Sequence, residues 1–127
     1  MRDIRDCSGP WKGTWVQGKV RGTMRNFRLT FTGNAITGEG NDLNGSFSMR
    51  GSYDPSNEAV KITKRYWHTK VVYEGVWNGS FVSGRSIIGP AWVGERGIFE
   101  MWPEDEEEAI ELAREVESFE RLEPVGV

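Results

Sequence analysis

The chain has 127 residues, which is enough for one hydrophobic core and too few for two ordinary domains. Hydrophobic residues make up 37% and charged residues 28%, a globular composition, and no apolar run approaches the length of a membrane span. The net charge of −3 is uneven, since residues 1–102 hold 14 basic against 9 acidic residues (+5), whereas residues 103–127 hold 2 against 10 (−8).

Residues 1–10 are expected to form a flexible leader. Met1 to Cys7 carry four charges and no apolar stretch, unlike a secretory signal or a lipoprotein anchor. Cys7 is the only cysteine, so an internal disulfide is excluded, and nothing near it resembles a base or a second metal ligand. We therefore expect a cytoplasmic protein with an unreactive free thiol and no membrane partner.

From Trp11 to Trp102 the dominant period is two, and Gly, Asn, Asp or Pro interrupts it about every ten residues. Large aromatic residues alternating with turn glycines also suit β-sheet better than helix. This pattern predicts one antiparallel β domain over 11–102, with about eight short strands joined by tight turns. The strands are expected near 13–20, 27–32, 35–40, 47–53, 58–67, 70–77, 81–88 and 97–102.

Two turns have a clear chemical basis. In Asp54-Pro55-Ser56-Asn57 the proline presets φ, and the Asp and Asn side chains can bond their own backbone. Asn78-Gly79 is the strongest hairpin signal, because both residues tolerate the positive φ of a type I′ turn. We expect this dipeptide to form a two-residue turn, with Trp77 paired to Ser80.

An acidic amphipathic helix is expected over 103–122, followed by a short tail at 123–127. Pro103 suits a first helical turn, and the acids that follow it are favoured by the helix dipole. Apolar residues at spacings of three and four form one stripe, which predicts that the helix docks on a surface, either of its own barrel or of a second chain. The stripe consists of Ala109, Leu112, Ala113, Val116 and Phe119.

Eight up-and-down strands are most stable when closed into a barrel, because closure removes the sheet edges. With Gly13-Thr14-Trp15 on the first strand and a helix after the last, the chain resembles the calycin superfamily of lipocalins, fatty-acid-binding proteins and avidins. The resemblance implies the barrel fold and burial of Trp15 at one barrel end. It carries no binding residue across, since no helical lid follows the first strand and the polar biotin contacts of avidins have no counterpart.

Six aromatic residues are expected to converge on the barrel interior. They are candidate ligand-binding residues, which could line a pocket for a flat apolar molecule, with tyrosine hydroxyls orienting it. Alternatively they fill the interior, as side chains do in many small barrels. The six are Trp15, Phe47, Tyr53, Tyr66, Tyr73 and Trp77.

Signals of catalysis are scarce. His68 lies beside a turn, with no Ser, Cys or carboxylate at a recognisable spacing. Glu74 would be a buried carboxylate if it pointed inward, but the register that places Tyr73 and Trp77 inside is favoured and leaves Glu74 outside. No phosphate loop, dinucleotide fingerprint or Cys and His cluster is present, so no cofactor, metal site or catalytic residue is expected.

Basic residues on aromatic-rich strands raise the possibility of nucleic-acid binding. The excess of five positive charges is modest, and the acidic segment would compete for the same surface, so a solvated charged face is favoured. These residues are Arg21, Arg25, Arg28, Lys61, Lys64 and Arg65.

Three functional hypotheses remain. The first is a noncatalytic module that binds a small apolar ligand or a protein segment in or at the mouth of the barrel. The second is an interaction or inhibitor protein that acts through its outer surface and its acidic helix, as a homo-oligomer or with another protein. A lyase or isomerase-like enzyme using His68 or Glu74 is less favoured than either.

Overall fold

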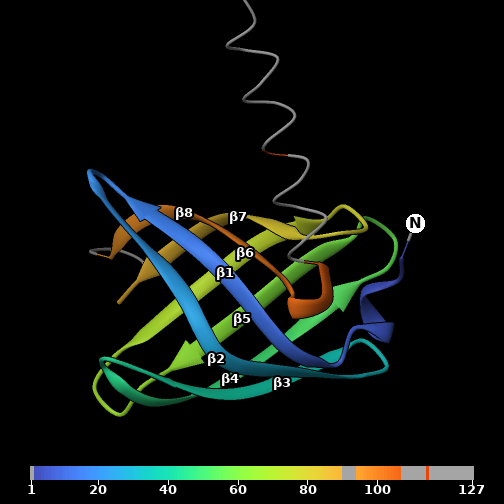
Figure 1. Ribbon diagram of the computed structural model, residues 1–127, viewed down its shortest axis with the longest axis horizontal. Helices are drawn as coiled ribbons and strands as arrows, with labels where there is room; N and C mark the ends of the chain where they lie inside the picture. Colours follow the sequence, from blue (N-terminus) through green and yellow to red (C-terminus); the bar gives the residue numbers. More distant parts are fainter. Residues whose placement is uncertain (1, 90–93, 107–113, 115–127) are drawn as a thin grey trace, which may run out of the picture.

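The computed structural model describes residues 2–89, 94–106 and 114. Eight antiparallel strands follow one another around a closed up-and-down barrel, in which each strand pairs with its neighbours in sequence and β8 pairs with β1 (Figure 1). The strands are β1 (Gly9–Gln17), β2 (Val20–Thr32), β3 (Ala35–Asp42), β4 (Gly45–Asp54), β5 (Ala59–Arg65), β6 (Lys70–Trp77), β7 (Val82–Ile88) and β8 (Glu95–Pro103). The all-β barrel predicted from the period-two pattern is thus confirmed.

The barrel begins and ends slightly outside the predicted range. β1 starts at Gly9 and β8 continues to Pro103, and the two strands pair along this extension, with Trp11 opposite Pro103. Part of the segment expected to be a flexible leader is folded onto the barrel, since Ile4–Asp6 form a 3-10 helix, η1, and Ile4 and Cys7 are buried. Burial raises the pKa of the Cys7 thiol, which fits the expected unreactive cysteine.

Alternation along each strand decides which side chains form the core. On β6, Val71, Tyr73 and Trp77 are buried, and Glu74 points outward, where it pairs with Lys61. The inward register favoured for Tyr73 and Trp77 is confirmed, and Glu74 is not a buried acid. It follows that Glu74 offers no carboxylate to the barrel interior.

The β6–β7 hairpin forms, but not through the predicted turn at Asn78-Gly79 with Trp77 opposite Ser80. Trp77 pairs with Val82 rather than with Ser80, so the connection has four residues, 78–81. The Asn78 side-chain oxygen accepts hydrogen bonds from the backbone N–H groups of Ser80 and Phe81, each at 2.9 Å. Asn78 therefore stabilises the turn with its side chain, which accepts hydrogen bonds from backbone N–H groups two and three residues later, as Asn and Asp commonly do in turns.

One end of the barrel is closed by the N-terminal segment. The Trp77 indole N–H donates to the Arg2 carbonyl at 2.8 Å, and Arg2 pairs with Asp105 and Glu106 of the 3-10 helix η2 (Glu104–Glu106). The connections β2–β3, β4–β5 and β6–β7 lie at this closed end, at the right in Figure 1. The connections β1–β2, β3–β4 and β5–β6 surround the opposite, open end, where β7 also ends and β8 begins.

The predicted helix over 103–122 is not observed in its first residues. Pro103 belongs to β8, and Glu104–Glu106 form a 3-10 turn. All of the predicted apolar stripe and the tail lie outside the described residues, but Arg114 is described, is helical, and ion-pairs with Glu100 of β8. Its guanidinium also lies 5.6 Å from the centre of the Trp102 ring. No helix among the described residues is long and apolar enough to cross a membrane.

Gly84 allows two strands to approach closely, which gives a first testable prediction. A Cβ atom at this position would lie 2.0 Å from the Glu74 carbonyl oxygen and 2.5 Å from the Cα of Gly75, so neither neighbour could yield without moving backbone. We expect Gly84→Ala to lower the free energy of unfolding by about 1 to 3 kcal/mol, as overpacking does. Denaturant unfolding measures this, with exposed Ser83→Ala as the control, and equal stabilities of the two variants would contradict the close approach.

Candidate functional site

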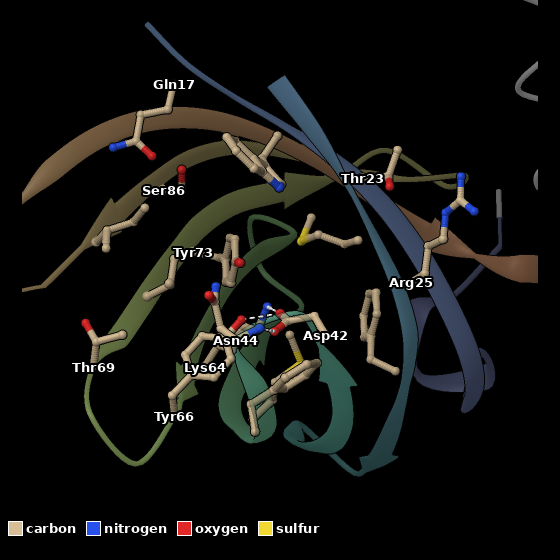
Figure 2. Close-up of a pocket in the computed structure, with 17 residues that line it drawn as sticks. Gln17, Thr23, Arg25, Asp42, Asn44, Lys64, Tyr66, Thr69, Tyr73 and Ser86 are labelled. Atoms are coloured by element: carbon tan, nitrogen blue, oxygen red, sulfur yellow. Dashed lines mark hydrogen bonds and ion pairs between the residues drawn. The ribbon is translucent and has the colours of Figure 1, made fainter. Parts of the chain in front are cut away.

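The open half of the barrel contains a cavity of about 170 Å³, lined by 17 residues (Figure 2). Its wall is mainly apolar, and polar side chains gather at its mouth and along one side. The closed half is filled by side chains, with Trp11 and Trp77 fully buried against each other at a centroid distance of 6.1 Å. The interior is therefore partly filled and partly hollow. The apolar wall includes Met24, Phe27, Phe47, Met49, Val71 and Ile88.

Four of the six predicted ligand-binding residues line this cavity, namely Trp15, Phe47, Tyr66 and Tyr73. Tyr53 and Trp77 do not line it, because they lie at the closed end of their strands. The Tyr53 hydroxyl donates to Glu58 at 2.7 Å, and burial together with this carboxylate raises its pKa to about 12. Tyr53 and Trp77 thus belong to the plug of the closed end.

The prediction that Trp15 is largely buried at a barrel end is confirmed only in part. Trp15 packs against the core, is partly exposed and lines the cavity, whereas Trp11, four residues earlier, is fully buried with Trp77 at the closed end. Gly9-Pro10-Trp11 is one of three Gly-x-Trp segments in the chain, and the Trp11 indole N–H donates to the Cys7 carbonyl at 2.8 Å. Opposite Trp15, Gly22 leaves room for the indole, since a Cβ there would lie 2.5 Å from the ring.

Lys64 is the main functional candidate that sequence reasoning missed. It was expected on a solvated charged face, but its side chain is only 8% exposed and points into the cavity. Its ammonium lies 4.1 Å from the centre of the Phe47 ring and 5.0 Å from that of Tyr66, both within cation–π range. The signal was present in the sequence, since Lys64 continues the inward alternation of Val60 and Ile62.

Asp42 connects Lys64 to Tyr66. Its carboxylate accepts a hydrogen bond from the Lys64 ammonium at 3.1 Å and another from the Tyr66 hydroxyl. It also accepts the backbone N–H of Asn44 at 2.8 Å, which closes the β3–β4 turn. Figure 2 shows Lys64, Asp42, Asn44 and Tyr66 gathered on one side of the cavity, with Gln17 and Ser86 across from them.

The proton affinities of this cluster reflect its partial burial. Burial lowers the pKa of Lys64, although the hydrogen bond and charge of Asp42 oppose the shift. Burial also tends to raise the pKa of Asp42, but the hydrogen bonds from Tyr66 and Lys64 outweigh it, so this pKa lies below its usual value. The pKa of Tyr66 is raised, first by burial and then by Asp42. At neutral pH the cluster is a lysine cation, an aspartate anion and a neutral tyrosine.

Lys64 retains hydrogen-bonding capacity toward the cavity. An ammonium group has three donors, and Asp42 is the one hydrogen-bond acceptor of Lys64 among the described residues. The remaining protons face the aromatic rings and the cavity, where a bound acceptor would find a cation with little competing water. The cluster is therefore suited to anchoring the polar end of a small molecule.

Apart from Arg25, the other candidates lie outside the cavity. His68 is exposed in the β5–β6 connection, where it stacks against Trp67 and Tyr66. Arg21, Arg28, Lys61 and Arg65 are exposed, as a charged face requires, and Arg25 is exposed while it also lines the cavity. Within 2–89, 94–106 and 114, no three metal-ligating side chains come together.

No family model, no curated protein and no solved structure matches this chain. The closed eight-stranded meander is compatible with the calycin-like architecture that Gly13-Thr14-Trp15 suggested. The chemistry of the cavity and of the Asp42, Lys64 and Tyr66 cluster is thus the basis on which a function can be argued.

Proposed function

We propose that the protein is a noncatalytic binding module of calycin type, which holds a small, mainly apolar molecule in the open half of its barrel. The observation that carries the proposal is an inward-pointing lysine cation at the side of an apolar cavity. In this proposal the apolar wall supplies affinity and Lys64 supplies orientation, a division typical of ligand pockets.

The size of the cavity limits the ligand. At about 170 Å³ it is comparable to the engineered cavity of about 150 Å³ that binds benzene. Ligand pockets usually have volumes of about 300 to 1,000 Å³. A fatty acid or a porphyrin would need a pocket within that range, which this cavity does not reach. The ligand is therefore a single ring or a short branched chain.

The polar anchor limits the ligand further. A carboxylate, carbonyl or similar acceptor on the ring would accept a proton from Lys64, whose other contacts are Asp42 and two ring faces. The ring itself would lie among Phe47, Met49 and Tyr73. An aromatic molecule with one acceptor group combines both requirements.

Binding rather than catalysis fits the arrangement of the cluster. The Asp42 carboxylate is already occupied by Lys64 and Tyr66, which hold it in place. Neither His68 nor Glu74 reaches the cavity, so the two residues on which a lyase or isomerase was considered lie away from it.

Titration with benzoate, benzamide and toluene tests the proposal, with backbone amide chemical shifts as the readout. We expect the two acceptor-bearing compounds to bind more tightly than toluene, with shifts confined to cavity-lining residues. Lys64→Met should weaken benzoate binding by about ten- to a hundredfold, since a hydrogen bond to a charged group contributes about 1.5 to 3 kcal/mol.

Lys61→Met is the matched control, because Lys61 lies on the same strand with its side chain 65% exposed and should leave binding unchanged. Circular dichroism establishes that both variants retain the fold. Equal affinity of the three compounds, or equal loss in the two lysine variants, would overturn the role of Lys64. Absence of saturable shifts for all three would overturn the cavity as a ligand site.

A further inference from the structure

The open rim of the barrel carries exposed apolar side chains on three separate hairpins. Val20 follows the β1–β2 turn, Leu43 lies in the β3–β4 turn, and Trp67 lies in the β5–β6 connection. Trp67 is 91% exposed and Leu43 is fully exposed. Single exposed apolar residues are ordinary, but three of the five large ones that the structure describes as exposed stand at one end.

The two ends of the barrel also differ in charge. The described residues of the open rim (17–22, 41–46, 64–70, 88–89 and 94–96) include six basic and two acidic residues, a net charge of +4. Those of the closed end (2–8, 33–34, 54–58, 78–81 and 103–106) include two basic and seven acidic residues, a net charge of −5. Among the described residues the apolar tips therefore stand in a basic surround, and the acidic excess lies at the opposite end of the barrel.

We propose that the open rim docks on an anionic lipid surface. Apolar tips set among basic side chains are the arrangement by which a peripheral protein inserts side chains at the headgroup boundary while its cations meet anionic lipids. Tryptophan is the residue most suited to this depth, because its large ring carries one polar N–H. The absence of a membrane span led us to expect no membrane partner, but docking through hairpin tips requires no span.

The placement of the tips favours lipid over a folded partner. Leu43 and Trp67 project from different hairpins, and Val20 stands beside a third turn. A fluid surface accepts separate tips independently, whereas a folded protein needs a complementary surface for all of them. This proposal stands on the rim alone and does not require a ligand in the cavity.

Vesicle sedimentation of the full chain tests the proposal. We expect binding to vesicles of phosphatidylcholine mixed with phosphatidylglycerol, little binding to phosphatidylcholine alone, and weakening by salt. Because the chain as a whole carries a charge of −3, its net charge alone would not attract it to an anionic vesicle. The paired variant Leu43→Ser with Trp67→Ser should reduce the partition coefficient by about tenfold or more.

Matched controls exist on the barrel wall. Val76→Ser with Ile98→Ser removes the other two exposed large apolar side chains and should leave binding unchanged. Lys19→Glu with Lys70→Glu should abolish binding, whereas Arg28→Glu with Arg50→Glu, on the walls of β2 and β4, should have a smaller effect.

Three results would overturn the proposal. The first is no binding to either vesicle, and the second is equal loss in the rim and wall pairs. The third is a dimer in solution that the change of Leu43 and Trp67 to serine dissociates, since the rim would then be a contact between copies of the chain.

Discussion

Replacing Trp11 with alanine is expected to lower the free energy of unfolding by about 3 to 5 kcal/mol, as for a large aromatic side chain in a core. Trp11 is only 1% exposed and packs against Trp77 and Phe31, and its N–H holds the carbonyl of Cys7. The substitution would open a cavity at the closed end and release the N-terminal segment that covers it. Chemical denaturation followed by circular dichroism measures the loss.

Alanine variants of two other tryptophans serve as comparisons for the loss of stability in Trp11→Ala. Trp67→Ala removes an indole that is 91% exposed and should change the stability by less than about 0.5 kcal/mol. Trp15→Ala should fall between the two, because Trp15 borders a cavity and is partly exposed. A Trp11→Ala loss no larger than that of Trp15→Ala would show that the closed end is not the more tightly packed half.

The exchange of roles between Trp11 and Trp15 shows what local sequence could and could not predict. Both follow a glycine by two positions, and both fit a strand. What separates them is the 3-10 helix η1, because the Cys7 carbonyl directly after it accepts the Trp11 indole N–H. A three-residue helix in a charged segment carries too little signal to be predicted, so the plug that buries Trp11 could not be anticipated.

The barrel itself was predictable because strand alternation and turn residues agree along the whole meander. The same alternation placed Phe47, Tyr66 and Tyr73 in the interior, where they line the cavity. It could not say that Tyr53 and Trp77 belong to the opposite end, because position along the barrel axis depends on the register of neighbouring strands. Lys64 was missed for another reason, since its charge was given more weight than its inward position after Val60 and Ile62.

The pairing of Asp42 with Lys64 also could not be read from the sequence. The two residues are 22 positions apart and come together because β4 lies between β3 and β5, with Gly40 opposite Phe47 and Ser48 opposite Arg65. A lysine buried in a barrel needs an acidic partner. The alternation of β5 shows that Lys64 points inward, but it does not show which acidic residue lies beside it. Only the order and register of β3, β4 and β5 identify Asp42 as that partner.

Replacing Asp42 with alanine is expected to cost about 2 to 3 kcal/mol at neutral pH, because it leaves the buried Lys64 ammonium without its counter-ion. This lies at or below the lower end of the range of about 3 to 5 kcal/mol for a fully buried pair, since the Asp42 side chain is 31% exposed. Denaturant unfolding of the wild type, Asp42→Ala, Lys64→Met and the double variant measures it. A loss of less than about 1 kcal/mol, as for a surface ion pair, would contradict the buried pairing.

The pH dependence of this loss follows from the direction of each shift. In Asp42→Ala, burial of Lys64 acts unopposed and holds its pKa further below the unfolded value, so the unfolded chain binds more protons than the folded one. The stability of the variant therefore rises with pH as the folded lysine loses its proton, and the deficit shrinks toward about pH 10. In the wild type the lowered pKa of Asp42 means that ionised Asp42 stabilises the folded state. This stabilisation is lost in acid, as the pH falls below about 4 and through the folded pKa of Asp42.

The double variant separates two effects of Asp42→Ala, the loss of the counter-ion of Lys64 and the loss of a hydrogen bond in the β3–β4 turn. Asp42→Ala also removes the acceptor of the Asn44 N–H in the β3–β4 turn, and Lys64→Met cannot restore that hydrogen bond. Recovery of stability on adding Lys64→Met to Asp42→Ala therefore measures the cost of the stranded cation alone, because an apolar side chain of similar length replaces it. Since the same substitution removes the proposed ligand anchor, a stable double variant that fails to bind benzoate would assign Lys64 to recognition rather than to folding.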